Sequence, residues 1–199
     1  MLRTLALVAL LAAAVSTAYA DDWPAPTTKY VKSDSGRYRV VVVPGAKSKP
    51  GSLELFDDRD QTKPKKLYRR APVNQVAPVK VLLSDGGQLV TLDEWDNAGY
   101  KHALVIYDKK GKVVVDCALE HLLLPDELAE VDTSISSRWW RLEEKPGGDV
   151  WLDGAAVLIK VKTKEAMVMR VDLATGVQTR DGQRVTIPGF DRCRARKKN

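Results

Sequence analysis

Two adjacent tryptophans between two arginines are the first candidates for a binding surface. They close the segment Ser134-Ile135-Ser136-Ser137-Arg138-Trp139-Trp140-Arg141. Neighbouring side chains on a strand point to opposite faces, so we expect one indole outside if the other belongs to the core. An exposed indole beside Arg138 and Arg141 can stack on a sugar ring or hold an anionic group. In the alternative interpretation both indoles are buried and the arginines cover their edges.

A second polar and aromatic cluster is Asp93-Glu94-Trp95-Asp96-Asn97-Ala98-Gly99-Tyr100. It lies between two predicted strands, where a loop is displayed at the rim of a sheet. Trp95 and Tyr100 can contact a sugar or a peptide, and the carboxylates suit Ca²⁺, which prefers oxygen ligands. The spacing differs from an EF-hand loop, so no metal ligand is assigned. A structured turn with Trp95 packed inward explains the same residues.

Signatures of catalysis are mostly missing from the sequence. It contains no Gly-x-Ser-x-Gly, His-Glu-x-x-His, Ser-x-x-Lys, P-loop or Gly-x-Gly-x-x-Gly pattern. Its histidines, His102 and His121, are expected on the surface or in structural roles. A glycosidase-like hydrolase can use two carboxylates alone, and Glu94 and Asp96 are the nearest candidates. No catalytic residue, metal or cofactor is assigned, and the carboxylate-based hydrolase stays an alternative.

Short runs rich in β-branched and aromatic residues alternate with Gly, Pro and Asp turns along the chain. This pattern predicts an all-β, antiparallel single domain over residues 21–191. Helical pattern is confined to 118–131, where Pro125 splits it into short turns. The predicted strands are Tyr38–Val43, Ser52–Phe56, Lys66–Arg70, Val79–Leu83, Gln88–Leu92, His102–Tyr107, Lys112–Cys117, Ala155–Thr163, Ala166–Asp172, Val177–Arg180 and Arg184–Ile187.

A weak internal repeat runs through these strands. Ser33-Asp34-Ser35-Gly36 returns as Ser84-Asp85-Gly86-Gly87, and each precedes an apolar strand. Strands ending on Asp108 and Asp172 each turn through a glycine and return. The Asp can accept hydrogen bonds from the turn backbone, and the Gly can take a positive φ. These residues are therefore expected to have a structural role.

The repeat resembles β-propeller repeats of the TolB, YVTN and WD40-like kind, in about three blade-like units near 33–75, 84–124 and 147–187. The stretch Ser84–Tyr107 is also similar to exported bacterial proteins of this repeat type, which implies no activity. The Trp-Asp ending of WD40 repeats is missing, and the first unit lacks the turn glycine after Asp60. Three units do not close a ring of about four to eight blades, so the resemblance implies an incomplete, open array or completion by oligomerisation. A β-sandwich is the alternative.

The first residues, Met1–Ala20, have the organisation of a cleavable signal peptide. Arg3 precedes the uncharged apolar run Leu5–Val15, and an Ala-x-Ala ending predicts cleavage between Ala20 and Asp21. The run is too short for a permanent transmembrane helix, and no lipid-anchor cysteine follows it. We therefore expect an exported protein, periplasmic or extracellular, with no stable membrane insertion after cleavage.

Export bears on the two cysteines, Cys117 and Cys193. An oxidising compartment favours a disulfide between them, and two free thiols are the alternative. The net charge of +6 is too small to indicate nucleic acid. A basic C-terminal tail, 192–199, can touch anionic surfaces.

These features lead to one functional hypothesis with two alternatives. The hypothesis is a non-enzymatic binding or interaction module of the cell envelope or exterior, whose partner is a protein or a carbohydrate. The alternatives are the hydrolase and a structural subunit that a partner or a second copy completes.

Overall fold

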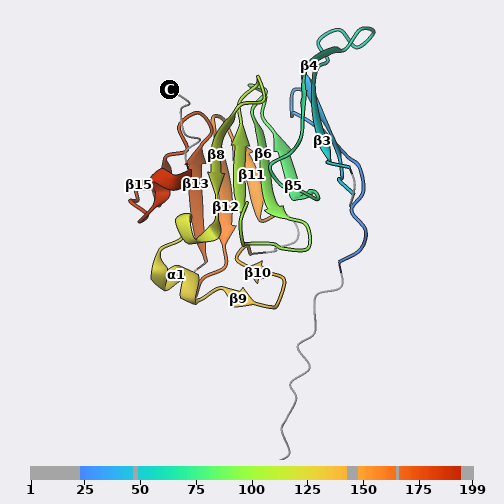
Figure 1. Cartoon of the computed structure of the whole chain (residues 1–199). Coiled ribbons are helices and arrows are strands. Elements are labelled where there is room, and N and C mark those ends of the chain that lie inside the picture. The colour runs from blue at the N-terminus through green and yellow to red at the C-terminus, as the bar shows by residue number, and fades with distance from the viewer. Residues whose placement is uncertain (1–22, 47–48, 143–147, 165, 194–199) are drawn as a thin grey trace, which may run out of the picture.

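The computed structural model describes residues 23–46, 49–142, 148–164 and 166–193. The predicted signal peptide, its cleavage point between Ala20 and Asp21, and residues 194–199 of the basic tail lie outside these ranges. Within them, the strands pair antiparallel and helix is limited to short turns (Figure 1). The prediction of an all-β protein is confirmed.

The first sheet contains four consecutive strands. Its middle strands alternate strictly, as expected where one face is buried: Val40 and Val42 face the core, whereas Val41 and Val43 face outward. The first strand was not predicted, because it is short and has a lysine at each end. The strands are β1 (Lys29–Lys32), β2 (Tyr38–Val43), β3 (Ser52–Asp57) and β4 (Lys65–Arg70).

The second sheet lies in the middle of the protein and is covered on both faces. Every residue of β6 and β7 is buried, which explains why apolar residues stand at neighbouring positions of these strands. One face shares a core with the first sheet, and the other shares a larger core with the third sheet. The strands are β5 (Pro78–Leu83), β6 (Leu89–Glu94), β7 (Leu104–Tyr107) and β8 (Val113–Cys117).

The third sheet has five strands, again in sequence order. Its first strand follows residues 143–147, which are not described, and was not predicted. The strands are β11 (Val150–Asp153), β12 (Ala156–Val161), β13 (Met167–Asp172), β14 (Gln178–Arg180) and β15 (Gln183–Arg184).

Short elements connect the second and third sheets and close the chain. The expected helical segment forms a 3-10 turn, η1 (Leu119–His121), and one α-helical turn, α1 (Pro125–Ala129). A two-stranded ribbon follows, made of β9 (Asp132–Thr133) and β10 (Arg138–Trp139). After β15, a second 3-10 turn, η2 (Phe190–Cys193), packs near β8.

The Ser-Asp and Asp-Gly motifs form turns between consecutive strands. Ser33 and Ser84 each follow the first strand of a sheet, and their hydroxyls accept hydrogen bonds from the N–H groups of Tyr38 (3.2 Å) and Gln88 (3.0 Å). Asp108 and Asp172 each follow or end the third strand, and both accept N–H bonds from the turn after them. The expectation that these residues build turns is confirmed.

The disulfide predicted between Cys117 and Cys193 is present and links β8 to η2 across 76 residues of sequence. It fixes the end of the described chain to the central sheet. No helix among the described residues is long and apolar enough to cross a membrane.

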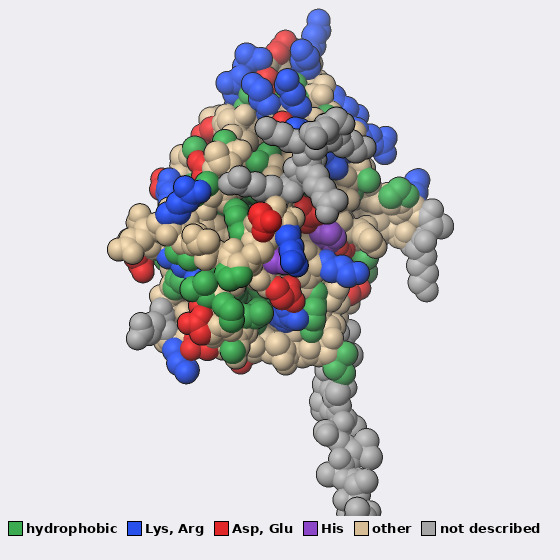
Figure 2. Space-filling model, turned by 60° about the vertical axis from the view of Figure 1, so that its left-hand side comes forward, with side chains coloured by type: hydrophobic (Ala, Val, Ile, Leu, Met, Phe, Trp, Pro, Cys, Tyr) green, Lys and Arg blue, Asp and Glu red, His purple; other side chains and the backbone are tan. Residues whose placement is uncertain are grey.

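Positive charge gathers around one hairpin of the first sheet. Figure 2 shows Lys and Arg side chains at the top of the molecule, around the hairpin that joins β3 and β4. Arg59, Lys63, Lys65 and Lys66 belong to this hairpin.

Candidate functional site

Three indoles from distant parts of the chain form one cluster, which we call the aromatic patch: Trp23, Trp95 and Trp139. The rings of Trp23 and Trp139 are stacked, with centroids 6.1 Å apart and an interplanar angle of 7°. Trp95 meets Trp23 edge-on, with centroids 5.2 Å apart. Both arrangements are favourable for aromatic pairs.

Backbone contacts position these indoles. Trp95 follows β6; its N–H donates to the carbonyl of Ala77 (2.9 Å), and its indole Nε1 donates to the carbonyl of Pro24 (3.0 Å). Trp139 lies in β10, where it pairs with Asp132. Trp139 is 39% exposed. It is therefore the member of the aromatic patch that a ligand can reach most directly.

Two cations and a phenol lie near the aromatic patch. The Lys29 ammonium lies 5.5 Å from the Trp95 ring centroid and donates to the carbonyls of Pro78 (3.0 Å) and Val79. Burial lowers the pKa of Lys29. The Arg138 guanidinium lies 4.4 Å from the Tyr100 ring centroid.

Arg138 and Tyr100 are held from a second side. Arg138 pairs with Glu120, and the Tyr100 hydroxyl lies 3.4 Å from the Ser134 carbonyl, to which it donates. The Arg138 N–H donates to the carbonyl of Ala98 at 2.9 Å. The loop of the second cluster and the ribbon of the first are thus joined, although they are far apart in sequence.

Trp140 and Arg141 point inward, unlike Trp139. Trp140 is 1% exposed, and its Nε1 donates to Asp93 Oδ1 at 2.8 Å. Arg141 Nε donates to Asp93 Oδ2 at 3.0 Å, and Arg141 Nη2 lies 2.9 Å from the same oxygen in an ion pair. One indole is exposed and its neighbour is buried, which is the first of the two arrangements considered for this segment. The structure places Trp140 and Arg141 beneath the surface rather than on it.

Arg141 also belongs to a chain of alternating charges, which we call the ion network: Lys80, Asp149, Arg141 and Asp93. Asp149 pairs with both Lys80 and Arg141. Burial raises the pKa of Asp93, and Arg141 and the other donors oppose that shift without cancelling it. Burial also pushes the pKa of Asp149 upward, but the hydrogen bond from Lys80 and the charge of Arg141 outweigh it and lower that pKa.

The carboxylates considered for hydrolysis do not form an evident acid–base pair. Glu94 is buried, and its two oxygens accept hydrogen bonds from the N–H groups of Gln75 (2.9 Å) and Val76 (2.8 Å). Asp96 is exposed at the next turn. Glu94 therefore anchors the connection before β5. Among the described residues, no group of three or more His, Cys, Asp or Glu side chains is arranged to hold a metal ion.

The histidines contact residues outside the aromatic patch. His102 Nδ1 is 2.8 Å from Asp116 Oδ1, and this hydrogen bond raises the pKa of His102. The His121 ring packs so closely on Gly189 that a Cβ added there would lie 2.9 Å from it.

Two further candidate residues, Trp23 and Gln178, were not predicted from the sequence. Trp23 lies in the segment Trp23-Pro24-Ala25-Pro26, which has no strand pattern. Its aromatic side chain, just after the predicted cleavage point, is the one sequence feature that could have marked it as a binding residue. Gln178 lines a pocket beside η2, and no sequence signal marks it.

No protein-family model, no curated protein sequence and no solved structure matches this chain.

Proposed function

We propose that this protein is a non-enzymatic binding module of the cell envelope or exterior, with a carbohydrate chain as its ligand. The aromatic patch is the contact surface. The observation that carries this proposal is the exposed ring of Trp139, stacked flat on Trp23 while its neighbour Trp140 is buried. Export of the protein rests on the signal-peptide pattern of residues 1–20.

The chemistry of the patch suits a sugar. Aromatic rings offer a wide apolar contact area, and a few polar groups placed around them fix the orientation of a ligand. Lys29, Arg138 and Tyr100 supply those polar groups. They are already held by the contacts described above, so binding orders few additional side chains and loses little affinity to entropy.

The experiment is a glycan-binding assay with the chain that begins at Asp21. We expect Trp139→Ala and Trp95→Ala each to weaken binding by about tenfold or more, as for central aromatic contacts elsewhere. Tyr30→Ala is the matched control, since Tyr30 is 72% exposed and lies on the outer face of the first sheet. Circular dichroism shows whether each variant is folded.

Two outcomes contradict the proposal. Folded Trp139→Ala and Trp95→Ala proteins that retain all glycan binding remove the aromatic patch from the site. Failure of the wild-type chain to retain any glycan, together with capture of an envelope protein in a pull-down, shows that the ligand class is wrong.

We also infer that the three sheets are propeller-like blades in an open array. The inference is supported by three consecutive antiparallel meanders stacked face to face. A second support is the position of the first strand of each sheet. These strands, β1, β5 and β11, together line one hollow of about 280 Å³. Inner strands that gather around a common axis are typical of propellers.

A structural subunit completed by a partner is the second candidate. It is favoured by the outer face of the first sheet, where Tyr30 is 72% and Val43 is 41% exposed. Size-exclusion chromatography with light scattering tests it. A dimer that Tyr30→Arg converts to a monomer supports this candidate, and a monomer at high concentration contradicts it.

A further inference from the structure

A pocket lies at the outer edge of the third sheet, between β14, β15 and η2. Its volume is about 400 Å³, within the range of about 300–1,000 Å³ typical of small-molecule sites. Figure 2 shows hydrophobic side chains gathered on the face that carries α1 and β15. The apolar residues that line the pocket are Val177, Val185, Ile187, Pro188 and Phe190.

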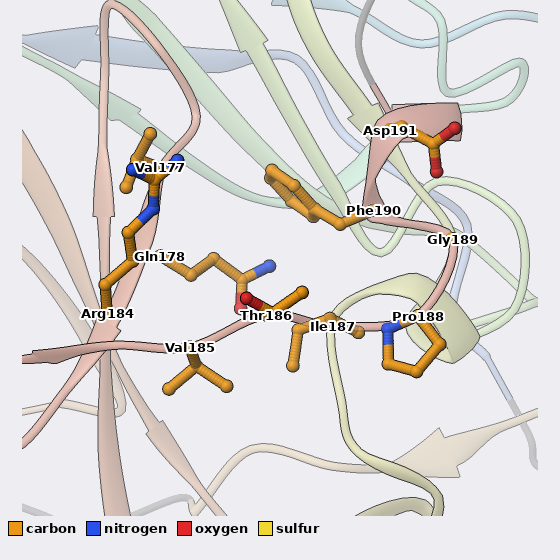
Figure 3. A pocket seen from close by; sticks show the side chains of 10 residues that line it. All are labelled: Val177, Gln178, Arg184, Val185, Thr186, Ile187, Pro188, Gly189, Phe190 and Asp191. Atoms are coloured by element: carbon orange, nitrogen blue, oxygen red, sulfur yellow. The ribbon is translucent and has the colours of Figure 1, made fainter.

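Gln178 is the unusual residue of this pocket. It is 2% exposed, and neither Nε2 nor Oε1 has a hydrogen-bond partner among the described residues. Figure 3 shows its side chain at the wall of the pocket, between Phe190 and Thr186. A buried amide without partners is costly, and folded proteins contain few of them. An unused donor and an unused acceptor therefore lie side by side at the wall of an apolar pocket.

The walls of the pocket are fixed by the fold. Gln178 pairs with Val171 in the sheet, and its carbonyl accepts a hydrogen bond from the Val185 N–H at 3.3 Å. Phe190 packs against the larger core, and η2 is tied to β8 by the disulfide of Cys193. A ligand would thus enter a cavity whose shape is held by a strand on one side and by the disulfide on the other.

The charges at the pocket are balanced. Arg184 and Asp191 both line it, so one positive and one negative side chain accompany the apolar residues. Neither sign of ligand charge is favoured by this pair. The Gln178 amide is neutral as well, so the pocket suits an uncharged molecule.

We propose that the pocket binds a small, uncharged, apolar molecule that carries a primary carboxamide or a lactam. In such a group the N–H and the C=O point the same way, so they can pair with the oxygen and the nitrogen of Gln178 in a closed ring of two hydrogen bonds. The apolar remainder would fill the space beside Phe190 and Val185. The pocket shares no residue with the aromatic patch, so this inference is independent of the proposed carbohydrate site.

The test compares benzamide with acetophenone, which has the same ring and carbonyl but no N–H. Protein-observed NMR titration of the oxidised protein gives both affinities. We expect benzamide to bind about tenfold more tightly, because acetophenone leaves the Gln178 oxygen without a donor. In Gln178→Leu the preference for benzamide should be lost. Thr179→Val, a change at the next residue on the opposite face of β14, should keep the preference for benzamide.

Three results overturn the proposal. They are equal affinities in the wild type, no shift of pocket signals by either probe, and a preference that survives in Gln178→Leu. Thermal unfolding provides a separate check, because replacing an unpaired buried amide by leucine should leave the melting temperature unchanged or raise it. A clear fall in melting temperature would mean that the amide already has partners, and would overturn the proposal as well.

Discussion

The indole of Trp140 donates to the carboxylate of Asp93 at 2.8 Å, and both side chains are 1% exposed. Asp93 is the penultimate residue of the buried strand β6, whereas Trp140 follows the ribbon that precedes the third sheet. This bond, together with the hydrogen bond and ion pair from Arg141 to the same carboxylate, connects the central sheet to the segment that displays Trp139. The exposed indole is therefore oriented by its buried neighbour.

Loss of the Asp93 charge should strongly destabilise the protein. Asp93→Asn leaves Arg141 with Asp149 as its remaining buried partner, and breaking a buried ion pair typically costs about 3–5 kcal/mol. Backbone strain does not contribute to this loss of stability. Asp93 has a φ of 57°, and asparagine adopts that conformation as readily as aspartate. The free energy of unfolding in urea measures the effect.

Asp96→Asn is the control for this change. Asp96 also has a positive φ, 65°, but its side chain is exposed. We expect its free energy of unfolding to stay within about 0.5 kcal/mol of the wild type. Equal destabilisation by the two substitutions would contradict a special role for Asp93.

The adjacent indoles should respond differently to the same substitution. Trp140→Phe removes the donor to Asp93 and leaves a void in the core, which should lower the free energy of unfolding by about 2–3 kcal/mol. Trp139→Phe should change it by less than about 0.5 kcal/mol, because Trp139 is at the surface. Urea unfolding of both variants checks this, and similar losses would mean that the two side chains share one environment.

The part of the structure that depends on local sequence was predictable. Turns at Ser33, Ser84, Asp108 and Asp172 follow from residues a few positions apart, and the strands follow from short apolar runs. An alternation of Trp139 and Trp140 was one of two arrangements that the sequence allowed, and which indole is inside was not predictable. That choice depends on Asp93, which is 47 residues away in sequence.

The parts that were missed depend on contacts between distant segments. Trp23 belongs to a segment without strand or turn pattern. Its neighbour Pro24 accepts a hydrogen bond from the indole of Trp95, which lies 71 residues later in the sequence. Whether the Gln178 amide has a hydrogen-bond partner depends on how η2 packs beside β14. The residues next to Gln178 in the sequence do not indicate this packing. The candidate site was therefore predicted in part, through Trp95, Tyr100, Arg138 and Trp139.

Removal of the disulfide should destabilise the protein by up to about 4 kcal/mol, the value of the chain-entropy model for a loop of this size. The cross-link spans 76 residues, so it restricts a long part of the unfolded chain. Urea unfolding of a Cys117→Ala and Cys193→Ala double variant measures the loss. Dithiothreitol should lower the midpoint of the wild type and leave that of the double variant unchanged. No effect on the wild type would show that the bond contributes nothing.

The pair of His102 and Asp116 should make stability depend on pH. The hydrogen bond to Asp116 raises the pKa of His102; the charge of Glu94 adds to the rise, whereas burial and Lys101 oppose it. Protonated His102 is therefore favoured in the folded state. Its contribution is complete below the pKa of the unfolded histidine, about 6.5, and is lost as the pH rises through the higher folded value.

His102→Gln should remove this dependence. Because both partners are partly exposed, with side-chain exposures of 21% and 34%, the contribution is about 0.5 kcal/mol, in the range of surface ion pairs. The difference in unfolding free energy between wild type and His102→Gln should thus be larger at low pH than above the folded pKa. Asp116→Asn should show the same loss, since it removes the acceptor that raises the pKa. The wild type and the two variants differ only in the pairing of His102 with Asp116. If their unfolding free energies follow parallel pH profiles, another group accounts for the pH dependence.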